Sequence, residues 1–387
     1  MTKPLYQHRN LQIIFLVTLI AVMGTSSITP AFPKMIQALG LSSESIGLLI
    51  TFFTLPGVIL TPVLGILADR YGRKRILIPA LLLFAIAGTA CAFVQDFRLL
   101  LLLRFLQGMG AAGLGAINVT LIGDLYAGSE RTAAMGYNAG VLSIGVASYP
   151  FIGGALAMLG WHYPFFLSLL ALPVALLVLL GLTSPRSLPE EHFRDYLHGV
   201  WQNLKNRQII GLFLSTFLSF VILFGAYLTY FPLLLGHNFE ASPLLIGLMM
   251  TSMSLSTAIT SSQLGRLRKA YSEKRLIQFA CLCYAIALFI FPLVETLWRF
   301  LLPTILFGIA QGLNIPNIQS LISERAPTRH RGAFMSLNGM VLRLGQTIGP
   351  LFVAGLYKFW GVSAVFYASA VLAFVMFGIV LVLVEEV

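Results

Sequence analysis

Twelve apolar stretches, each about 20 residues long, limit what this chain can fold into more than any other feature of the sequence. They cover residues 11–33, 45–67, 75–95, 99–124, 132–157, 162–183, 208–235, 243–265, 275–296, 299–322, 332–357 and 362–384. A helix needs about 20 mainly apolar residues to cross a bilayer. Residues 76–87 show none of the alternation that marks the strands of a porin-like barrel. The sequence therefore predicts an all-α membrane protein with twelve transmembrane helices.

The charged residues support this reading and orient the chain. Only 10% of the 387 residues are charged, whereas roughly a quarter are charged in a soluble domain. The net charge is +11, but 19 of the 25 Lys and Arg fall in loops on one side of the predicted membrane and only 4 on the other. This bias follows the positive-inside rule. It predicts a multi-pass protein of a bacterial plasma or inner membrane with both termini in the cytoplasm, and it argues against a nucleic-acid partner.

A repeat divides the chain into halves. Ten residues recur at an offset of 200 positions: Leu64, Gly65, Tyr71, Lys74, Arg75, Arg131, Met135, Asn138, Gly145 and Pro150 match Leu264, Gly265, Tyr271, Lys274, Arg275, Arg331, Met335, Asn338, Gly345 and Pro350. We therefore expect two pseudo-symmetric six-helix bundles, residues 1–183 and 208–387. In the segment 184–207 apolar residues recur at helical spacing, which predicts a cytoplasmic amphipathic helix. That helix is either a tether between moving halves or a passive linker.

Three motifs carry a resemblance to a known family. They are Gly65-x-x-x-Asp69-Arg70-x-Gly72-Arg73-Lys74, Arg104-x-x-Gln107-Gly108-x-Gly110-Ala111-Ala112, and Gly136-x8-Gly145-x3-Tyr149-Pro150-x2-Gly153-Gly154. They resemble the loop 2–3, fourth-helix and fifth-helix signatures of the major facilitator superfamily, in its twelve-helix drug:proton antiporter branch. One position departs from the pattern, because the family has Gly where this chain has Tyr149. The resemblance implies the two-bundle fold of that superfamily and transport by alternating access.

The first motif predicts a latch on the cytoplasmic side. We expect Gly65 to allow close helix approach and Gly72 a tight turn. Asp69 is placed to accept hydrogen bonds at a helix N-terminus in the other half. We further expect Arg70 to pair with Asp124 at the end of the fourth helix. For Arg70, Arg73, Lys74 and Arg75 the alternative is a role in topology alone.

The other two motifs predict packing and coupling. In the fifth helix, Gly145, Pro150 and Gly154 are expected to allow tight packing against the other half and a bend; generic packing of small residues is the alternative. Arg104 and Arg343 lie within apolar spans, where a charge is costly and marks a functional site. The resemblance gives Arg104 a role in proton coupling. Arg343 belongs to no motif, and it either binds an anionic substrate group or pairs with backbone carbonyls.

Polar and aromatic residues at mid-span depth are candidates for the wall of a substrate cavity between the halves. They are Asn118, Phe224, Tyr227, Tyr230, Gln311, Asn314, Asn317, Asn338, Arg343 and Gln346. For any one of the polar residues, hydrogen bonding between helices is the alternative. None of the 14 Asp and Glu falls at mid-membrane depth. The resemblance implies a carboxylate at this depth in many relatives that export cationic drugs, so its absence here favours a neutral or anionic amphiphile as substrate.

These observations favour one function over its rivals. The sequence has no P-loop, so an ion gradient is the expected energy source. It also offers no clustered His, Asp or Glu for a membrane enzyme, and no pattern for a metal or cofactor. We expect a monomeric secondary transporter that exports small amphiphilic compounds by proton antiport, with lipid, protons and a small molecule as its partners. The alternative is a facilitator or proton symporter for a small polar or anionic metabolite.

Overall fold

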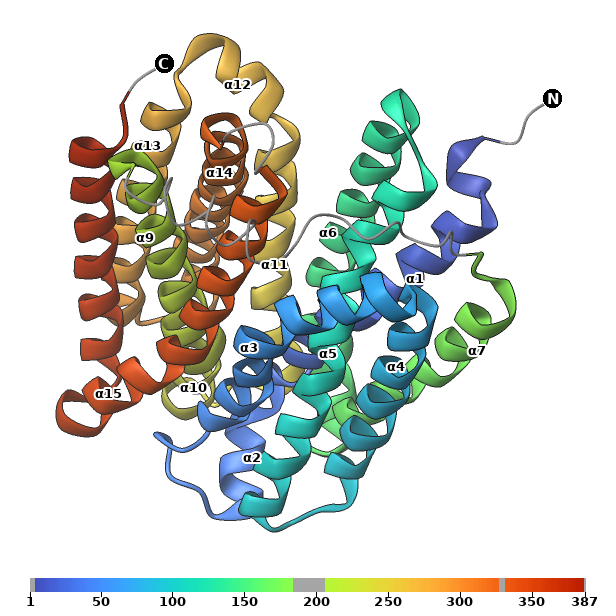
Figure 1. The fold of residues 1–387 in the computed structure, drawn as a ribbon. Helices are drawn as coiled ribbons and strands as arrows, with labels where there is room; N and C mark the ends of the chain where they lie inside the picture. The colour runs from blue at the N-terminus through green and yellow to red at the C-terminus, as the bar shows by residue number, and fades with distance from the viewer. Residues whose placement is uncertain (1–3, 184–205, 327–330, 386–387) are drawn as a thin grey trace. The chain divides into compact units, whose positions relative to one another are not determined.

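The computed structural model describes residues 4–183, 206–326 and 331–385, and every regular element in these ranges is a helix (Figure 1). Eleven helical segments in these ranges are long and apolar enough to span a membrane. The last of them, Phe334–Leu383, has 50 residues, which is more than two spans require. It breaks at Gly361, whose φ of 76° is a conformation that favours glycine. The twelve-helix prediction is thus confirmed, with two spans merged into one helix.

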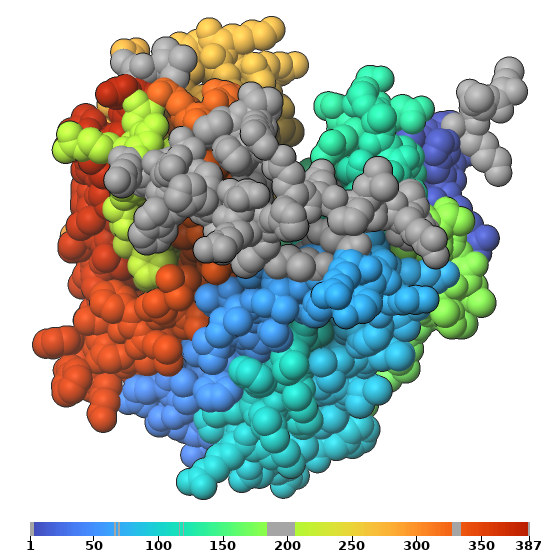
Figure 2. Space-filling model, in the orientation of Figure 1, coloured from blue at the N-terminus to red at the C-terminus, as the bar shows by residue number. Residues whose placement is uncertain are grey.

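The chain forms two compact units by its internal contacts, one made of Met1–Leu41 and Phe52–Glu190 and the other of Ser42–Thr51 and Glu191–Val387. In the space-filling view most of unit 1 is blue to green and most of unit 2 is yellow-green to red (Figure 2). The segment Ser42–Thr51 belongs to unit 2, although it precedes most of unit 1 in the sequence. The predicted amphipathic helix lies almost entirely outside the described residues, and the predicted boundaries at residues 183 and 208 stay a prediction.

Unit 1 carries the first six spans. Its elements are η1 (Leu5–Gln7), α1 (Arg9–Ser26), η2 (Thr29–Ala31), α2 (Phe32–Leu39), α3 (Leu48–Tyr71, of which the first four residues belong to unit 2), α4 (Arg73–Ala90), η3 (Cys91–Phe93), α5 (Phe97–Leu125), α6 (Gly128–Leu159), η4 (Tyr163–Leu170) and α7 (Ala171–Gly181). Gly72 alone separates α3 from α4, and its φ of 97° makes this sharp turn possible. Asp96 caps α5 by accepting from the Leu99 amide at 2.8 Å.

Unit 2 carries the remaining six. Its elements are α9 (Arg207–Val221), the π-helix η5 (Ile222–Tyr230), α10 (Phe231–Asn238), α11 (Pro243–Ser262), α12 (Leu264–Ala270), α13 (Glu273–Ile290), η6 (Phe291–Leu293), η7 (Leu297–Phe300), α14 (Leu301–Arg325) and α15 (Arg331–Leu383). Ser272 replaces the turn glycine of unit 1 and caps α13 instead, accepting from the Arg275 amide at 3.4 Å. The loop of the second copy therefore folds differently, with the separate helix α12 before it.

The repeat predicted from the sequence reappears in the contacts inside each unit. Lys74 Nζ donates to the Leu182 carbonyl after α7 at 3.4 Å, and Lys274 Nζ donates to the Leu381 carbonyl in the last turn of α15 at 3.1 Å. Both bonds satisfy a carbonyl that the end of a helix leaves without an intrahelical partner. Equivalent residues of the two sequence copies therefore make equivalent contacts.

Candidate functional site

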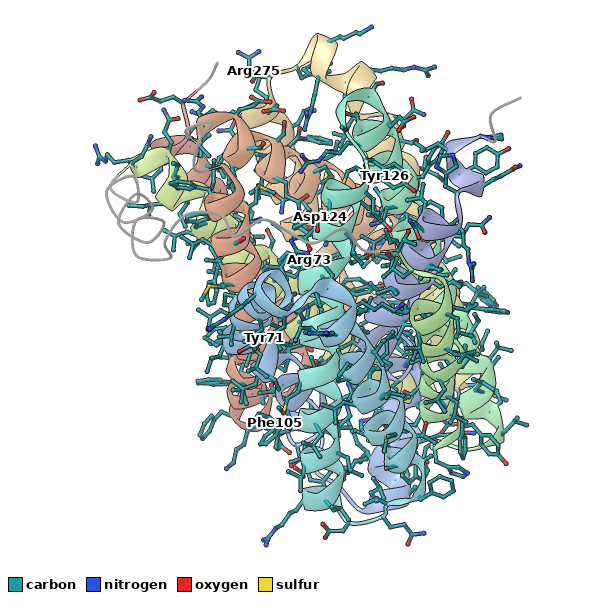
Figure 3. All side chains as sticks on the ribbon, turned by 45° about the vertical axis from the view of Figure 1, so that its right-hand side comes forward. Tyr71, Arg73, Phe105, Asp124, Tyr126 and Arg275 are labelled. Carbon is teal, nitrogen blue, oxygen red and sulfur yellow. The ribbon has the colours of Figure 1, made fainter. Side chains whose placement is uncertain are left out.

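The loop 2–3 motif places an ion pair between α4 and α5. Arg73 Nε donates to Asp124 Oδ2 at 2.9 Å, and the two residues lie together in Figure 3. The Arg73 side chain is only 7% exposed and that of Asp124 26%. Asp124 is the second-last residue of α5, where the helix dipole disfavours a negative charge, so the arginine compensates it.

The predicted pair of Arg70 with Asp124 is therefore wrong. Arg70 is exposed at the end of α3, and its guanidinium carbon lies 5.5 Å from the centre of the Tyr71 ring. The physical reason is the turn at Gly72, which makes Arg73 the first residue of α4 and brings it to the end of α5. The basic run thus does more than orient the protein in the membrane.

Two other predictions for this motif concern Gly65 and Asp69. A Cβ built at Gly65 meets no atom within 4 Å, so in the described part of the chain no helix packs closely on it. Whether a helix of the other half approaches Gly65 stays a prediction. The side chain of Asp69 lies outside the described residues, and its role in a latch stays a prediction.

Arg104 of the fourth-helix motif is fully buried inside unit 1. Its Nη1 donates to Gln107 Oε1 at 2.6 Å, and Gln107 Nε2 donates to Ser168 Oγ of η4 at 2.9 Å. Its guanidinium carbon also lies 4.2 Å from the centre of the Phe53 ring on α3. Gly88 leaves room for this cluster, since a Cβ there would lie 2.3 Å from both Gln107 Nε2 and Ser168 Oγ. The charge is thereby surrounded by neutral groups of α3, of η4 and of its own helix α5.

The small residues of the same motif bring α5 close to its neighbours. A Cβ at Gly108 would lie 2.1 Å from the Phe53 carbonyl oxygen, and one at Gly110 would lie 2.6 Å from that of Ala80. Such distances are possible only when no side chain stands between two helix backbones. The motif therefore places a charge on α5 and packs α5 tightly around it. The role of Arg104 in proton coupling stays a prediction.

The fifth-helix motif packs α6 against α1 of the same unit. A Cβ at Gly145 would lie 2.9 Å from the Leu19 side chain, and one at Gly153 would lie 1.8 Å from the Ser27 carbonyl oxygen. Pro150 and Gly154 are buried beside them, and Tyr149 is 8% exposed within the hydrophobic core of unit 1. Glycines 145 and 153 thus serve packing inside the unit. The expected packing of α6 against the other half stays a prediction.

In each unit, two buried hydrogen bonds tie helices together at related positions. Asn138 Oδ1 on α6 accepts from Thr18 Oγ1 on α1 at 2.5 Å, as Asn338 Oδ1 on α15 accepts from Thr216 Oγ1 on α9 at 2.8 Å. Two further asparagines make similar bonds: Asn118 Nδ2 on α5 donates to Thr18 Oγ1 at 2.5 Å, and Asn314 Nδ2 on α14 donates to Ser219 Oγ on α9 at 2.6 Å. The cavity candidates Asn118, Asn314 and Asn338 are therefore engaged between helices. The Oδ1 atoms of Asn118 and Asn314 have no hydrogen-bond partner among the described residues.

Two cavity candidates, Tyr227 and Gln311, belong to an aromatic cluster inside unit 2. Tyr227, in the π-helix, stacks on Phe231 and on Phe307, with ring centres 4.9 Å and 4.8 Å apart. Phe307 also meets the edge of the Tyr284 ring, and the Tyr284 hydroxyl hydrogen-bonds to Gln311 Oε1. The Tyr227 hydroxyl is buried without a hydrogen-bond partner in the described ranges. Departures from α-helical geometry of this kind occur often at functional sites.

The remaining candidates lie elsewhere in the unit. Phe224 and Tyr230 are buried, with ring centres 6.1 Å from Phe220 and 5.0 Å from Tyr357. Asn317 Oδ1 accepts from Arg268 Nε at 2.8 Å, and Gln346 is half-buried on α15. That these residues and Asn118 line one cavity stays a prediction. Sequence reasoning missed Phe53, Tyr284 and Arg268, because aromatic residues in a span and basic residues in a loop carry no signal of their own.

Arg343 lies on the face of α15 that also carries Thr347 and Pro350, which residues 42–51 contact. Thr347, one turn further along this face, accepts at its carbonyl from Thr51 Oγ1 at 3.1 Å. Pro350, a further turn along, lies 3.1 Å from a Cβ built at Gly47. Residues 344, 348, 351 and 352, on the opposite side, are exposed and apolar. Arg343 itself is half-buried, and its backbone carbonyl accepts from Thr347 Oγ1 at 2.9 Å. Its guanidinium takes part in none of the ion pairs or side-chain hydrogen bonds found in the described part of the chain.

A family model for the Major Facilitator Superfamily matches residues 14–239 and 212–387. The chain belongs to the Major Facilitator Superfamily. It is therefore a multi-pass membrane transporter, and the alternative of a membrane enzyme is excluded.

Among its relatives in this superfamily is multidrug resistance protein 2 of Bacillus subtilis, which is 28% identical over 90% of this chain and 89% of its own length. Quinolone resistance protein NorA of Staphylococcus aureus is 25% identical over 98% of this chain and 97% of its own length. Among solved structures, nucleoside transporter NupG superposes with a TM-score of 0.80 at 15% identity, over 96% of this chain and 99% of that one. The structural match shows that the fold is that of the superfamily.

Proposed function

We propose that this chain exports small neutral or anionic amphiphiles across a bacterial inner membrane by alternating access and proton antiport. Support for export comes from full-length similarity to proteins whose names state drug resistance. Support for an ion gradient as energy source comes from the lack of a P-loop. The charge bias of the loops supports cytoplasmic termini. We further propose that the protein works as a monomer.

The observation that carries the substrate class is Arg343. Arg343 places a cation within a membrane span. It lies on the same face of α15 as the residues that residues 42–51 contact, and on the side away from the exposed apolar residues. An embedded charge of this kind marks a substrate or ion pathway. A guanidinium favours carboxylate or phosphate groups, which it binds with two parallel hydrogen bonds. Because like charges repel, the Arg343 guanidinium disfavours a cationic drug. We therefore assign the recognition of an anionic or hydrogen-bond-accepting group to Arg343.

Transport into inverted membrane vesicles tests this proposal. Uptake of a carboxylate-bearing amphiphile is compared with uptake of a cationic dye of similar size, with and without an imposed pH gradient. For Arg343→Ala we expect the KM of the anionic compound to rise about tenfold, the equivalent of about 1.4 kcal/mol, while uptake of the dye is unchanged or better. Arg343→Lys keeps the charge and should retain part of the affinity. A strong cation preference that persists in Arg343→Ala contradicts the proposal.

A second function has one observation in its favour. Tyr149 stands where the antiporter pattern has Gly, which weakens the inference of export and favours a facilitator or proton symporter. The same vesicles separate these functions. An exporter fills inverted vesicles when their interior is acidic and stops when a protonophore collapses the gradient. A facilitator equilibrates the compound in either direction and is indifferent to the protonophore.

A further inference from the structure

The ring of Phe53 lies against the buried charge of unit 1. The guanidinium carbon of Arg104 is 4.2 Å from the ring centre, within the range of a cation–π interaction. Such contacts are strongest where water is excluded, and Arg104 is fully buried. The ring belongs to α3 and the arginine to α5, so this contact joins the second span to the fourth.

The surroundings hold the Phe53 ring in one place. A Cβ at Gly24 on α1 would lie 2.5 Å from Phe53 Cζ, so α1 packs directly on the end of the ring. A Cβ at Gly108 on α5 would lie 2.1 Å from the Phe53 carbonyl oxygen, so the backbones also touch. The Phe84 ring on α4 meets Phe53 edge to face, with centres 6.4 Å apart at 75°. With α1, α4 and α5 all against it, the ring presents a fixed face to Arg104.

We propose that Phe53 is a positioning residue for Arg104. Its ring face and Gln107 Oε1 together fix the direction of the guanidinium, because one holds the plane and the other holds Nη1. A change in the strength of the ring contact therefore changes how well Arg104 performs its part in transport. This inference rests on the proposed function in one respect, namely that Arg104 takes part in coupled export.

Fluorinated phenylalanines introduced at position 53 test the inference without removing the ring. Each added fluorine weakens the negative face of the ring and changes its shape little. We expect the maximal export rate to fall stepwise, by about tenfold for the trifluorinated ring. The matched control is the same series at Phe32, a fully buried ring on α2 of the same unit that is not among the contacts described for Phe53. Its export rate should stay within about twofold of the natural protein. A flat series at position 53, or equal declines at both positions, overturns the proposal.

A second measurement does not require export. Unfolding temperatures of the purified protein are compared for Phe53→Leu, Arg104→Gln and the double variant. We expect Phe53→Leu to lower the unfolding temperature clearly in the natural background and at most half as much in Arg104→Gln. Additive losses show that the two side chains do not interact, which refutes the inference. Because this cycle is decided even if the natural protein exports nothing, failure of the proposed function and failure of this inference are told apart.

Discussion

At the scale of single residues, Arg73 shows how one charge serves two purposes. It counts toward the positive inner loops, and it also neutralises Asp124 at the end of α5. Its neighbour Arg70 counts equally toward the loops but lies exposed over the Tyr71 ring. The two arginines differ by only three positions in the sequence. The structure therefore distinguishes a buried, ion-paired arginine from an exposed one.

This difference predicts unequal effects of the same substitution. Arg73→Gln leaves Asp124 without its partner, and because that carboxylate is partly exposed we expect a loss of about 1–3 kcal/mol in unfolding free energy. Arg70→Gln, the matched control, should change it by less than about 0.5 kcal/mol. Thermal unfolding of the purified protein in detergent measures both. Equal losses would show that the Arg73–Asp124 pair adds nothing to stability.

At the scale of the element, α6 depends on glycine at some positions and tolerates it at others. Gly153 touches the Ser27 carbonyl, whereas a Cβ at Gly140 meets no described atom within 4 Å. The sequence does not distinguish these two glycines, because both are small residues in the same glycine-rich span. Only the packing of α6 on α1 distinguishes the glycine that permits contact from the glycine that does not.

Alanine substitutions at these two positions of α6 should therefore differ in their effect on stability. In Gly153→Ala the added carbon overlaps a backbone oxygen, so α1 and α6 must separate, at a cost of about 1–3 kcal/mol or more. Gly140→Ala should be neutral within about 1 kcal/mol, since alanine also favours the helix. The folded, monodisperse fraction after size-exclusion chromatography reports each effect. Comparable damage from Gly140→Ala would mean that another surface covers that face of α6.

At the scale of the whole molecule, the repeat and the loop charges together predict a shared orientation of the two halves. Residues Arg75 and Arg275 occupy equivalent exposed positions, at the starts of α4 and α13. Arg299 is exposed in η7, directly before α14. We place the first two in the cytoplasm and the third outside.

Labelling of single cysteines by a membrane-impermeant maleimide tests this topology. The three natural cysteines, all buried, are first replaced. Arg75→Cys and Arg275→Cys should react in inverted vesicles and not in intact cells, and Arg299→Cys should show the reverse. Labelling of positions 75 and 275 from opposite sides would contradict parallel halves and, with them, the assignment of alternating access.

The sequence predicts the spans well and the partners poorly, for a physical reason. The length and apolar content of a span follow from the thickness of the bilayer. For this reason the sequence alone divides α15 into two spans, which the structure shows to break at the positive φ of Gly361. A partner depends on rotation about the helix axis. Asn118 and Asn314 are evident as polar residues at depth, yet only the packed helices show that each faces a hydroxyl on the first helix of its own unit. For Phe53 the sequence holds no hint, because rings are common on every face of a span.

The two lysine bonds at the helix ends have a consequence for how the protein is made. By the positive-inside rule we expect Lys74 and Lys274 to influence which side each loop keeps during membrane insertion. In the folded protein their ammonium groups bind carbonyls at the ends of the sixth and twelfth spans. A neutral residue at either position should therefore affect both membrane insertion and the folded protein. The translocon would meet a weaker orientation signal, and later a terminal carbonyl would be left to water.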